Sequence, residues 1–340
     1  MRPIFQADLV NGPFGDPGLL VDLKFQRRAL LFDLGDLGAL PTRKMLRVTD
    51  VFVSHAHMDH FAGFDRLLRV CLGRDTGVHL YGPPGFIEQV GHKLSAYTWN
   101  LVDNYESEFG ILVSEIAPEG RVDHARFGSR DRFRRKDLEP TRADAGLLLD
   151  DPFFRVRCRF LDHGIPSLAF RFEEGMHINV WKSRLEELGL PTGPWLTELR
   201  RLVRENAPAE TPIVVRWRDR GGARERSYTV GELRARVLEL VPGQTVCYVT
   251  DVAWTDANAR GIVEFASGAD TLYIEAVFLD ADGDHAARKL HLTARQAGEL
   301  ARAAGVRVAI PFHFSPRYIE REQDLRREFE DGWRGAASPG

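Results

Sequence analysis

The chain alternates short runs of apolar residues with stretches in which apolar residues recur at helical spacing. The runs, rich in Val, Ile, Phe and Tyr, predict β-strands, and the recurring pattern predicts amphipathic helices. This alternation is typical of an α/β architecture. The predicted strands cover residues 18–23, 29–33, 50–54, 78–81, 153–161, 167–173, 245–250, 271–277 and 306–312, and the predicted helices cover residues 61–72, 84–94, 194–205, 231–239 and 293–304.

The last of these helices has the clearest predicted ends. Thr293 can cap it, because a threonine hydroxyl accepts a hydrogen bond from a backbone N–H of the first turn. Gly305 follows the last turn, where a glycine commonly ends a helix. The apolar stripe of this helix consists of Leu292, Ala297, Leu300, Ala301 and Ala304.

Two stretches interrupt the alternation. Residues 119–142 are charged and rich in turn-forming residues, which predicts a surface excursion. Residues 174–244 include a segment that reads as a hairpin around Gly221 and Gly222. We therefore predict a single domain over residues 1–320 with an arm or insertion within residues 174–244, followed by a C-terminal helix and tail over residues 321–340.

Composition places the chain among ordinary globular proteins. Of 340 residues, 44% are hydrophobic and 28% are charged, which excludes disorder as the dominant state. The formal net charge of −3 excludes a globally basic nucleic-acid coat but not a local basic patch.

No apolar run reaches the roughly 20 residues that span a bilayer. Cys71, Cys158 and Cys247 lie far apart, as buried thiols do in a reducing compartment, so we expect a cytoplasmic protein without membrane contact.

A dense group of potential metal ligands follows the predicted strand at residues 50–54. Within six positions the chain places His55, His57, Asp59 and His60, and Gly63 then opens the next helix. Imidazole nitrogens and a carboxylate oxygen suit zinc. The alternating positions allow His55 and His57 to reach one ion and Asp59 and His60 to reach a second. A chance run of polar residues in a solvated loop is the alternative, and three histidines and an aspartate in this order make it a poor one.

Three further candidate ligands stand just past predicted strands, where open α/β sheets gather their sites. They are His163, Asp251 and His313. We expect Asp251 to bridge two ions, preferentially Zn²⁺ with Mn²⁺ or Fe²⁺ as alternatives, and a water between the ions to be hydroxide near neutral pH. Taken singly, a histidine at a strand end is more often structural and an aspartate there is often a helix cap.

His291 and Glu275 are weaker candidates. His291 lies just before the capped helix, apart from the strand-end set, and is interpreted as a general acid that protonates a leaving oxygen. A surface histidine near a helix start explains it equally well. Glu275 is a polar residue within an apolar run and is interpreted as orienting a ligand histidine, with a core hydrogen-bonding role as the alternative. The other histidines are expected to be surface or packing residues: His79, His92, His124, His177 and His285.

The motif His55-Ala-His57-Met-Asp59-His60 with Gly63 resembles the signature of the metallo-β-lactamase superfamily. The resemblance implies a four-layer αβ/βα sandwich with a di-zinc site. Three later segments are similar to the ribonuclease Z branch, the tRNA 3′-processing endonucleases: FLDHGIPSLAFRF, IEAVF with HLTARQAGELARAAGV, and IPFHFSPRY. In that branch the histidine matching His291 is the catalytic residue. GLPTGPWLTELRR resembles the base of the branch's RNA-binding arm, so the likeness spans most of residues 50–320.

Several positions depart from the pattern of that branch. The turn after the first strand is ADLVNGPFGDPG instead of a Gly/Thr-rich turn. Met58 and Thr250 stand where the branch usually has glycine, and Leu292 stands where it has serine. Glu198 stands near the position of a lysine in the arm-base segment, which removes a phosphate contact and adds a negative charge. These departures leave the predicted zinc chemistry intact and bear on the choice of tRNA as substrate.

The predicted reaction is attack of a metal-bridging hydroxide on a phosphodiester, with Asp59 orienting the nucleophile and His291 donating a proton. If the branch assignment holds, the substrate is precursor tRNA and the protein a homodimer. Alternatives are a small-molecule hydrolase acting on a cyclic nucleotide or other phosphodiester, a lactone or a thioester, and a non-catalytic metal-stabilised module. Predicted substrate contacts are the hairpin arginines Arg216, Arg218, Arg220, Arg224 and Arg226, with Trp217 among them, and Ser315 and Arg317.

A second basic run is a weaker RNA-binding candidate. It consists of Arg130, Arg132, Arg134, Arg135 and Lys136, and Phe133 stands among them, as stacking on bases requires. For both basic segments the alternative is a solvated arginine-rich surface.

Overall fold

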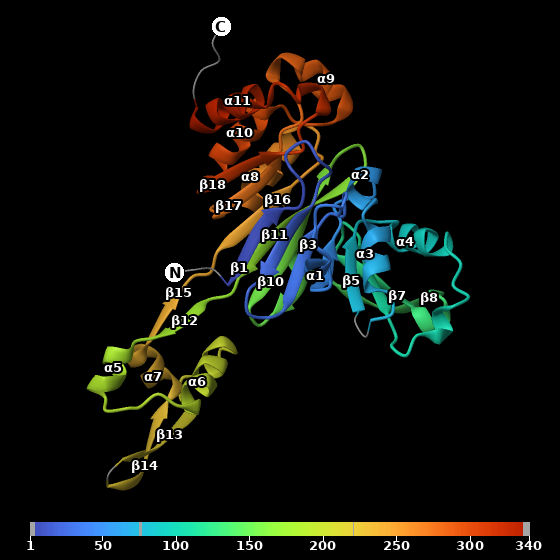
Figure 1. The fold of residues 1–340 in the computed structure, drawn as a ribbon. Coiled ribbons are helices and arrows are strands. Elements are labelled where there is room, and N and C mark those ends of the chain that lie inside the picture. The colour runs from blue at the N-terminus through green and yellow to red at the C-terminus, as the bar shows by residue number, and fades with distance from the viewer. Residues whose placement is uncertain (1–3, 75–76, 220, 336–340) are drawn as a thin grey trace. The chain divides into compact units, whose positions relative to one another are not determined.

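The computed structural model of the protein describes residues 4–74, 77–219 and 221–335 (Figure 1). The chain divides into two compact units. The first comprises Met1–Leu149, Val156–Phe172 and Thr245–Gly340, and the second comprises Asp150–Arg155 and Glu173–Gln244. Each unit contains a hydrophobic core of its own.

The first unit contains an eight-stranded sheet whose strands follow one another in chain order. Strands β3 to β6 run parallel to one another, and the flanking strands pair antiparallel. The strands are β1 (Phe5–Leu9), β2 (Leu19–Leu23), β3 (Arg28–Phe32), β4 (Val48–Phe52), β5 (Gly77–Gly82), β6 (Gly110–Ile116), β7 (Arg121–Gly128) and β8 (Arg135–Arg142).

A second sheet has six strands in the order β18-β17-β16-β11-β10-β9. Its strands β16, β17 and β18 are parallel. The strands are β9 (Leu147–Asp151), β10 (Phe154–Asp162), β11 (Pro166–Glu174), β16 (Thr245–Val249), β17 (Thr271–Glu275) and β18 (Val308–Phe312).

Aromatic side chains join the two sheets face to face. The ring of Phe32 lies 5.6 Å from that of Phe170 and 6.1 Å from that of Tyr248, and the rings of Phe52 and Phe170 are 5.7 Å apart. These rings are buried, so the facing surfaces form a dry core. Neighbouring residues of the same strands point to the opposite faces, as alternation along a strand requires.

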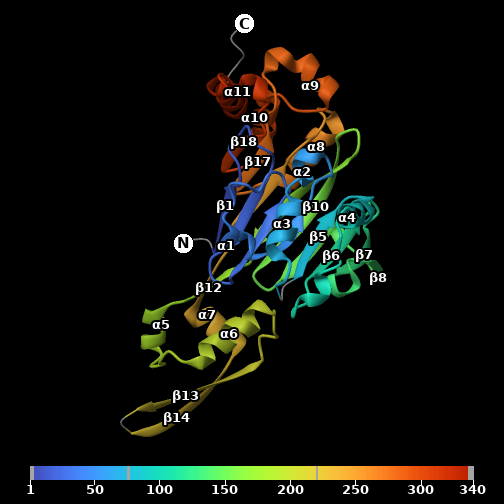
Figure 2. The same ribbon diagram turned by 45° about the vertical axis from the view of Figure 1, so that its right-hand side comes forward.

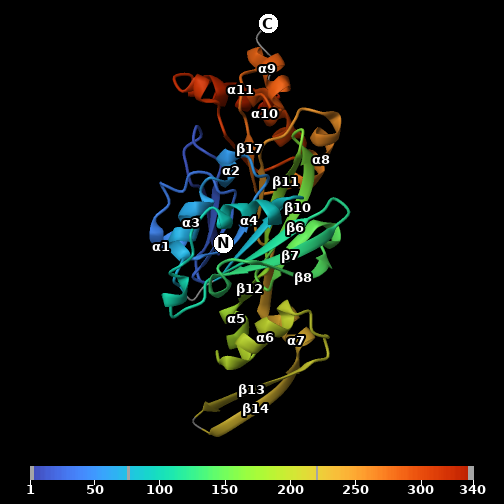
Figure 3. The same cartoon turned by 90° about the vertical axis from the view of Figure 1, so that its right-hand side faces the viewer.

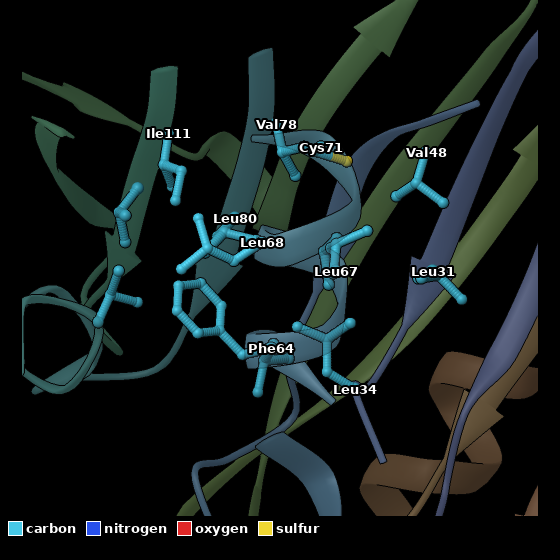
Figure 4. Close-up of a cluster of buried hydrophobic side chains, with 14 of the residues drawn as sticks. Leu31, Leu34, Val48, Phe64, Leu67, Leu68, Cys71, Val78, Leu80 and Ile111 are labelled. Carbon is cyan, nitrogen blue, oxygen red and sulfur yellow. The ribbon is translucent and has the colours of Figure 1, made fainter. Parts of the chain in front are cut away.

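Helices cover the outer face of each sheet. Against the first sheet, α3 packs Phe64, Leu67 and Leu68 onto Val78 and Leu80 of β5 (Figure 4). On the second sheet, α8 and α10 cover β16 to β18, and α10 packs along α11 (Figure 2). The predicted four-layer αβ/βα sandwich is confirmed. The helices of this unit are α1 (Thr42–Met45), α2 (Met58–Phe61), α3 (Phe64–Cys71), α4 (Phe86–Ser95), α8 (Asp256–Ala266), α9 (Gly283–Lys289), α10 (Ala294–Ala303) and α11 (Glu322–Arg334), with 3₁₀ turns at Val102–Asn104, Ser129–Asp131, Asp144–Gly146, Asp280–Asp282 and Pro316–Tyr318.

The second unit is a small helical and hairpin assembly around its own core. Trp195 and Leu199 pack with Ile213, Val215 and Leu233 in that core. Strands β13 and β14 pair antiparallel from Pro212↔Thr229 to Asp219↔Gly222, which confirms the hairpin. The elements are β12 (His177–Val180), α5 (Lys182–Glu187), α6 (Pro194–Arg204), β13 (Pro212–Asp219), β14 (Gly222–Thr229), α7 (Val230–Val237) and β15 (Leu238–Val241), and β12 pairs with β15.

Each predicted strand and helix overlaps an element of the structure. The capped helix is confirmed as α10, where Thr293 and Gln296 bond reciprocally to each other's backbone N–H and Gly305 follows with φ of 64°. The predicted surface excursion at residues 119–142 is wrong, because this stretch forms β7 and β8 at the edge of the first sheet (Figure 3). All eight residues of β8 are exposed, so the strand has no apolar face to reveal it in the sequence.

The parallel strands bring their carboxyl ends together and so position the chemistry. Asp33 follows β3, His55 follows β4, Asp251 follows β16 and His313 follows β18. Gly63, at the start of α3, packs closely against the loop that follows β3. A Cβ at Gly63 would lie 2.1 Å from the carbonyl oxygen of Gly35 in that loop. Only glycine permits this approach, which holds the histidine-rich turn against the first sheet.

The three cysteines are buried thiols, as predicted. Along the described residues, we find no helix with both the length and the apolar content needed to cross a bilayer.

Candidate metal centre

The histidine-rich turn supplies ligands to two separate groups. His55, His57, His163 and Asp251 each offer an atom, and these atoms all lie within 4.8 Å of one another. Asp59, His60 and His313 form a second group by the same measure. The division within the turn is the one that the sequence predicts, because its extended residues alternate in direction until α2 begins at Met58.

Asp251 lies between the two groups with one oxygen toward each. Its Oδ2 is 3.6 Å from His55 Nε2 and 3.4 Å from His163 Nε2. Its Oδ1 is 3.3 Å from His60 Nε2 and 2.9 Å from His313 Nδ1. The carboxylate is buried, and its backbone φ of 32° is a strained value for a residue other than glycine. Asp251 therefore has the geometry of a bridging ligand.

Three ring nitrogens in the two ligand groups indicate whether a metal ion fits the site. His55 Nε2, His60 Nε2 and His313 Nδ1 are buried and make no hydrogen bond. Orphaned buried nitrogens cost stability unless something satisfies them. Burial lowers the pKa of His55 to about 2, which keeps its imidazole neutral and able to bind a cation. The donor set fits a divalent metal ion.

The second group carries more charge. Burial opposes protonation of His313, but Asp251 and Asp59 outweigh it and raise the pKa of His313 to about 10. Burial also opposes ionisation of Asp251, yet the neighbouring His60 and His313 hold the pKa of Asp251 well below its usual range. Protons on these histidines balance the charge of the buried carboxylate, and a divalent ion held by the same residues would supply that positive charge instead.

Asp33, which the sequence analysis missed, orients a ligand of the second group. Its Oδ2 accepts hydrogen bonds from His60 Nδ1 at 2.9 Å, from Ser54 Oγ at 2.9 Å and from the hydroxyl of Tyr248 at 3.0 Å. Its Oδ1 accepts from the backbone N–H of Ser54 at 2.7 Å. All four groups are buried. With its Nδ1 proton held by Asp33, His60 presents Nε2 to the metal centre.

Glu275 and His291 form a hydrogen-bonded pair beside the two groups. Glu275 Oε2 accepts from His291 Nδ1 at 2.8 Å, and Oε1 accepts from the backbone N–H of Val252 at 2.9 Å. The histidine partner of Glu275 is thus His291, and one atom from each of Glu275, His291, His313 and Asp251 lies within 4.8 Å of the others. The ring centroid of His291 lies 5.0 Å from that of His163 and 5.7 Å from that of His313.

The residues that depart from the ribonuclease Z pattern have different surroundings. Thr250 is buried and its hydroxyl bonds Asp251 Oδ1 at 3.0 Å, so it supports the bridging carboxylate. Leu292 lies in the core of the second sheet. Met58 is 84% exposed at the start of α2. Glu198 is exposed on α6 and pairs with Arg201 at 2.7 Å.

The hairpin arginines are exposed on β13 and β14, with Arg220 outside the described residues. Arg216 pairs with Glu225 at 2.6 Å, and the guanidinium of Arg226 lies over the ring of Trp217 at 5.7 Å. Arg218 lies on the same face of the hairpin as Arg216, whereas Arg224 pairs with Trp217 and lies with Arg226 on the other face. Ser315 and Arg317 follow His313 in the first unit, and the Arg317 guanidinium lies 5.9 Å from the Phe278 ring.

The second basic run does not have the features expected of an RNA-binding patch. Arg132 pairs with Asp103 at 3.0 Å, and Arg135 pairs with Asp137 at 2.6 Å. Lys136 bonds Asp131. Phe133 is 5% exposed and packs on Trp99, so the predicted role in base stacking is wrong.

The remaining histidines lie outside the metal groups. His79 and His124 share the hydroxyl of Ser114 at 2.6 Å and 2.7 Å on the first sheet. His177 lies 3.1 Å from Glu174, His92 lies 3.8 Å from Glu88, and the His285 ring packs edge-on against Phe278.

Comparison with known proteins extends this picture. The chain matches no family model. It is 33% identical to the ribonuclease Z of Deinococcus radiodurans over 329 residues, which cover 95% of this chain and 93% of that protein. It is 28% identical to the ribonuclease Z of Gloeothece citriformis, with 88% of this chain and 79% of that protein covered.

Two solved structures share the fold. The metallo-β-lactamase fold protein YhfI from Bacillus subtilis matches with a TM-score of 0.53 at 17% identity, covering 98% of this chain and 94% of that chain. The short form of human tRNase Z matches with a TM-score of 0.53 at 20% identity, covering 94% of each chain. The metallo-β-lactamase fold predicted from the histidine motif is therefore confirmed. Because nearly its whole length aligns at 33% identity with a curated ribonuclease Z, the chain belongs to the ribonuclease Z family of metal-dependent hydrolases.

Proposed function

We propose that the protein is an endoribonuclease that removes the 3′ extension of precursor tRNA by hydrolysing a phosphodiester bond, with two zinc ions per chain. The observation that carries the proposal is Asp251, whose two oxygens face two ligand groups with unpaired ring nitrogens. Family membership supports RNA as the substrate. The products would be a tRNA with a 3′-hydroxyl and a trailer with a 5′-phosphate.

The ligand sets follow from the two groups. His55, His57, His163 and Asp251 would hold one ion, and Asp59, His60, His313 and Asp251 would hold the other. Two divalent ions held by these residues would supply an activated water and neutralise the phosphate oxygens in the transition state. Burial and the hydrogen bonds of Asp33 fix the ligands before any ion binds, so little reorganisation is needed.

His291 is suited to protonate the departing 3′ oxygen. Burial opposes its charged form, but Glu275 outweighs burial and raises the pKa of His291. Glu275 holds the ring through Nδ1, which leaves Nε2 as the nitrogen that can donate. A histidine with a raised pKa keeps its proton to higher pH and can release it as negative charge develops on the leaving oxygen.

Asp59 is suited to orient the attacking water. Its side chain is 42% exposed, unlike the buried Asp251, so substrate and water can reach it. Burial of its carboxyl group is outweighed by the neighbouring imidazoles of His313 and His60, which hold the pKa of Asp59 below its usual range. Asp59 is therefore ionised and accepts hydrogen bonds from a water molecule at neutral pH.

The second unit supplies a surface for the body of the tRNA. The net charge of −3 leaves no general attraction for a polyanion, so binding needs a local basic feature. We assign this role to the β13–β14 hairpin, as the equivalent of the family's RNA-binding arm, and phosphate contacts in the first unit to Ser315 and Arg317. A homodimer, in which one subunit's arm serves the other's site, and a cytoplasmic location belong to the same proposal.

The experiment is cleavage of a 3′-extended tRNA by the zinc-loaded protein. We expect a single cut, two zinc ions per chain, and a rate that falls steeply with salt. His291→Ala should keep both ions and lower the rate by about 10²–10⁴-fold, the range for a lost general acid. His285→Ala is the matched control, since this neighbouring histidine packs on Phe278 without facing the ligand groups.

A small-molecule hydrolase makes the opposite prediction. Rapid turnover of bis-p-nitrophenyl phosphate without cleavage of the tRNA would replace RNA by a small phosphodiester. Turnover of lactones alone would remove phosphodiester chemistry. Fewer than two zinc ions per chain at the pH of activity would contradict the dinuclear centre.

A further inference from the structure

Leu290 has an unusual backbone conformation at the rim of the metal centre. It ends α9 with φ of 61° and ψ of 39°, in the left-handed region. Bulky apolar residues rarely adopt this conformation, which normally selects glycine or asparagine at a helix end. Strain of this kind is retained mainly where a side chain or a backbone group has a function.

The backbone function of this position does not require a leucine. The carbonyl oxygen of Leu290 accepts a hydrogen bond from His163 Nδ1 at 2.8 Å, which directs His163 Nε2 toward Asp251. A glycine would present the same carbonyl without strain. The retained leucine side chain therefore needs a second explanation.

Its surroundings point to contact with a ligand. Leu290 is 36% exposed and stands next to His291 in the chain. Its Cδ1 lies over Gly164, where an added Cβ would approach it to 2.7 Å. Ile165, in the same turn as His163, is 41% exposed. Two exposed apolar side chains thus adjoin a centre otherwise made of imidazoles and carboxylates, and the apolar part of a nucleotide substrate is its base.

We propose that Leu290, together with Ile165 in the turn on which Leu290 packs, contacts the nucleobase next to the scissile phosphate and so helps to determine which nucleotide is accepted there. The inference rests on the proposed function in that the ligand is a nucleotide. It does not depend on tRNA being the natural substrate. A base packed on an aliphatic side chain loses apolar surface to water without needing a hydrogen-bond partner, so the contact favours a base over no base.

The test compares a nucleotide with its phosphate alone. Dissociation constants of adenosine 5′-monophosphate and inorganic phosphate are measured by calorimetry for the zinc-loaded full-length protein and its Leu290→Gly variant. We expect the variant to bind the nucleotide about tenfold more weakly, a loss of about 1.4 kcal/mol, and to bind phosphate unchanged. Its unfolding temperature should stay the same or rise, because glycine removes the strain.

Two further variants serve as controls. Leu290→Met keeps an apolar side chain and should retain nucleotide binding. Phe25→Ala removes an 82% exposed aromatic ring in the β2–β3 turn, at the end of β3 opposite Asp33, and should change neither constant. Five residues of strand separate that turn from the centre by about 15 Å.

Each contrary outcome has one meaning. Equal weakening of nucleotide and phosphate binding would make Leu290 a support for His163 and overturn the base contact. Unchanged nucleotide binding with a lowered unfolding temperature would make it a packing residue, which also overturns the proposal. If the wild type binds the nucleotide as predicted but cleaves no tRNA, the proposed function fails and the base contact stands.

Discussion

Replacing Asp33 by asparagine tests how strongly a buried carboxylate controls the metal centre. The substitution keeps the shape of the side chain but turns one acceptor oxygen into a donor. That atom must then face Ser54 Oγ, the Tyr248 hydroxyl and His60 Nδ1, all of which now donate to Asp33. The two hydroxyls can rotate and accept. The imidazole can accept at Nδ1 only if its proton moves to Nε2, which is the nitrogen that must bind the metal.

The size of the effect follows from these contacts. Hydrogen bonds to a charged group contribute about 1.5–3 kcal/mol each, so loss of two of the four would lower the free energy of unfolding of the metal-free protein by at most about 3–6 kcal/mol. Loss of a partner that orients a ligand histidine weakens metal binding by about 10–100-fold. Since His60 belongs to the second ligand group, the loss should fall on one of the two ions.

The assay separates the two effects. Zinc affinity is measured by competition with a chromophoric chelator, and unfolding by denaturant in excess chelator. Asp50→Asn is the matched control, because Asp50 is also buried on β4 but bonds Arg28 at 2.7 Å, away from the ligands. It should lower stability and leave both zinc affinities unchanged. An Asp33→Asn protein that binds both ions with wild-type affinity would refute the orienting role of Asp33.

Three other predictions concern stability and substrate binding. Thr293→Ala removes the cap of α10 and should lower the free energy of unfolding by about 0.5–2 kcal/mol, measured by denaturant titration. Burial lowers the pKa of His79 from 6.5 to about 4, so protonation of His79 opposes folding. The contribution of His79 to the free energy of unfolding is therefore constant above pH 6.5 and falls as the pH drops from 6.5 to 4. Between pH 7 and 5, a His79→Gln variant should lose about 1–2 kcal/mol less than the wild type, the range allowing for solvent screening; an equal loss would contradict this. A variant with alanine at Arg216, Arg218 and Arg224 of the hairpin should have a higher KM for a 3′-extended tRNA. The salt dependence of this KM should be smaller than in the wild type, and turnover of bis-p-nitrophenyl phosphate should not change.

The candidate ligands could be found in the sequence because their signal is local. His55, His57, Asp59 and His60 fall in one turn, and the remaining ligands follow strands that apolar runs reveal. Parallel strands then bring distant positions together at one edge of each sheet, so the rule that sites lie past strand ends was sufficient. The same rule applies to Asp33, which directly follows β3, but a single aspartate after a strand has no histidine neighbours to mark it.

Other features could not be predicted because they depend on position in space. Strand β8 has no apolar face and is held by its backbone pairing with β7, so its composition indicates a surface loop. Phe133 stands among basic residues in the chain, yet the fold turns its ring onto Trp99 and Phe109. Leu290 becomes notable only through its backbone angles and its carbonyl contact with His163.

The two proposed roles of histidine in this site, metal ligand and proton donor, both use a hydrogen bond at Nδ1 that fixes the ring. His60, His163 and His291 are each held through Nδ1, by Asp33 at 2.9 Å, by the carbonyl of Leu290 at 2.8 Å and by Glu275 at 2.8 Å. What differs is the position of the other nitrogen. Asp251 is paired with His60 and His163 through their Nε2 atoms, whereas the ion pair of His291 is with Glu275. Burial opposes the charged form of His291, but Glu275 outweighs it and raises the pKa of His291, and a raised pKa is the property that the proposed proton donor needs.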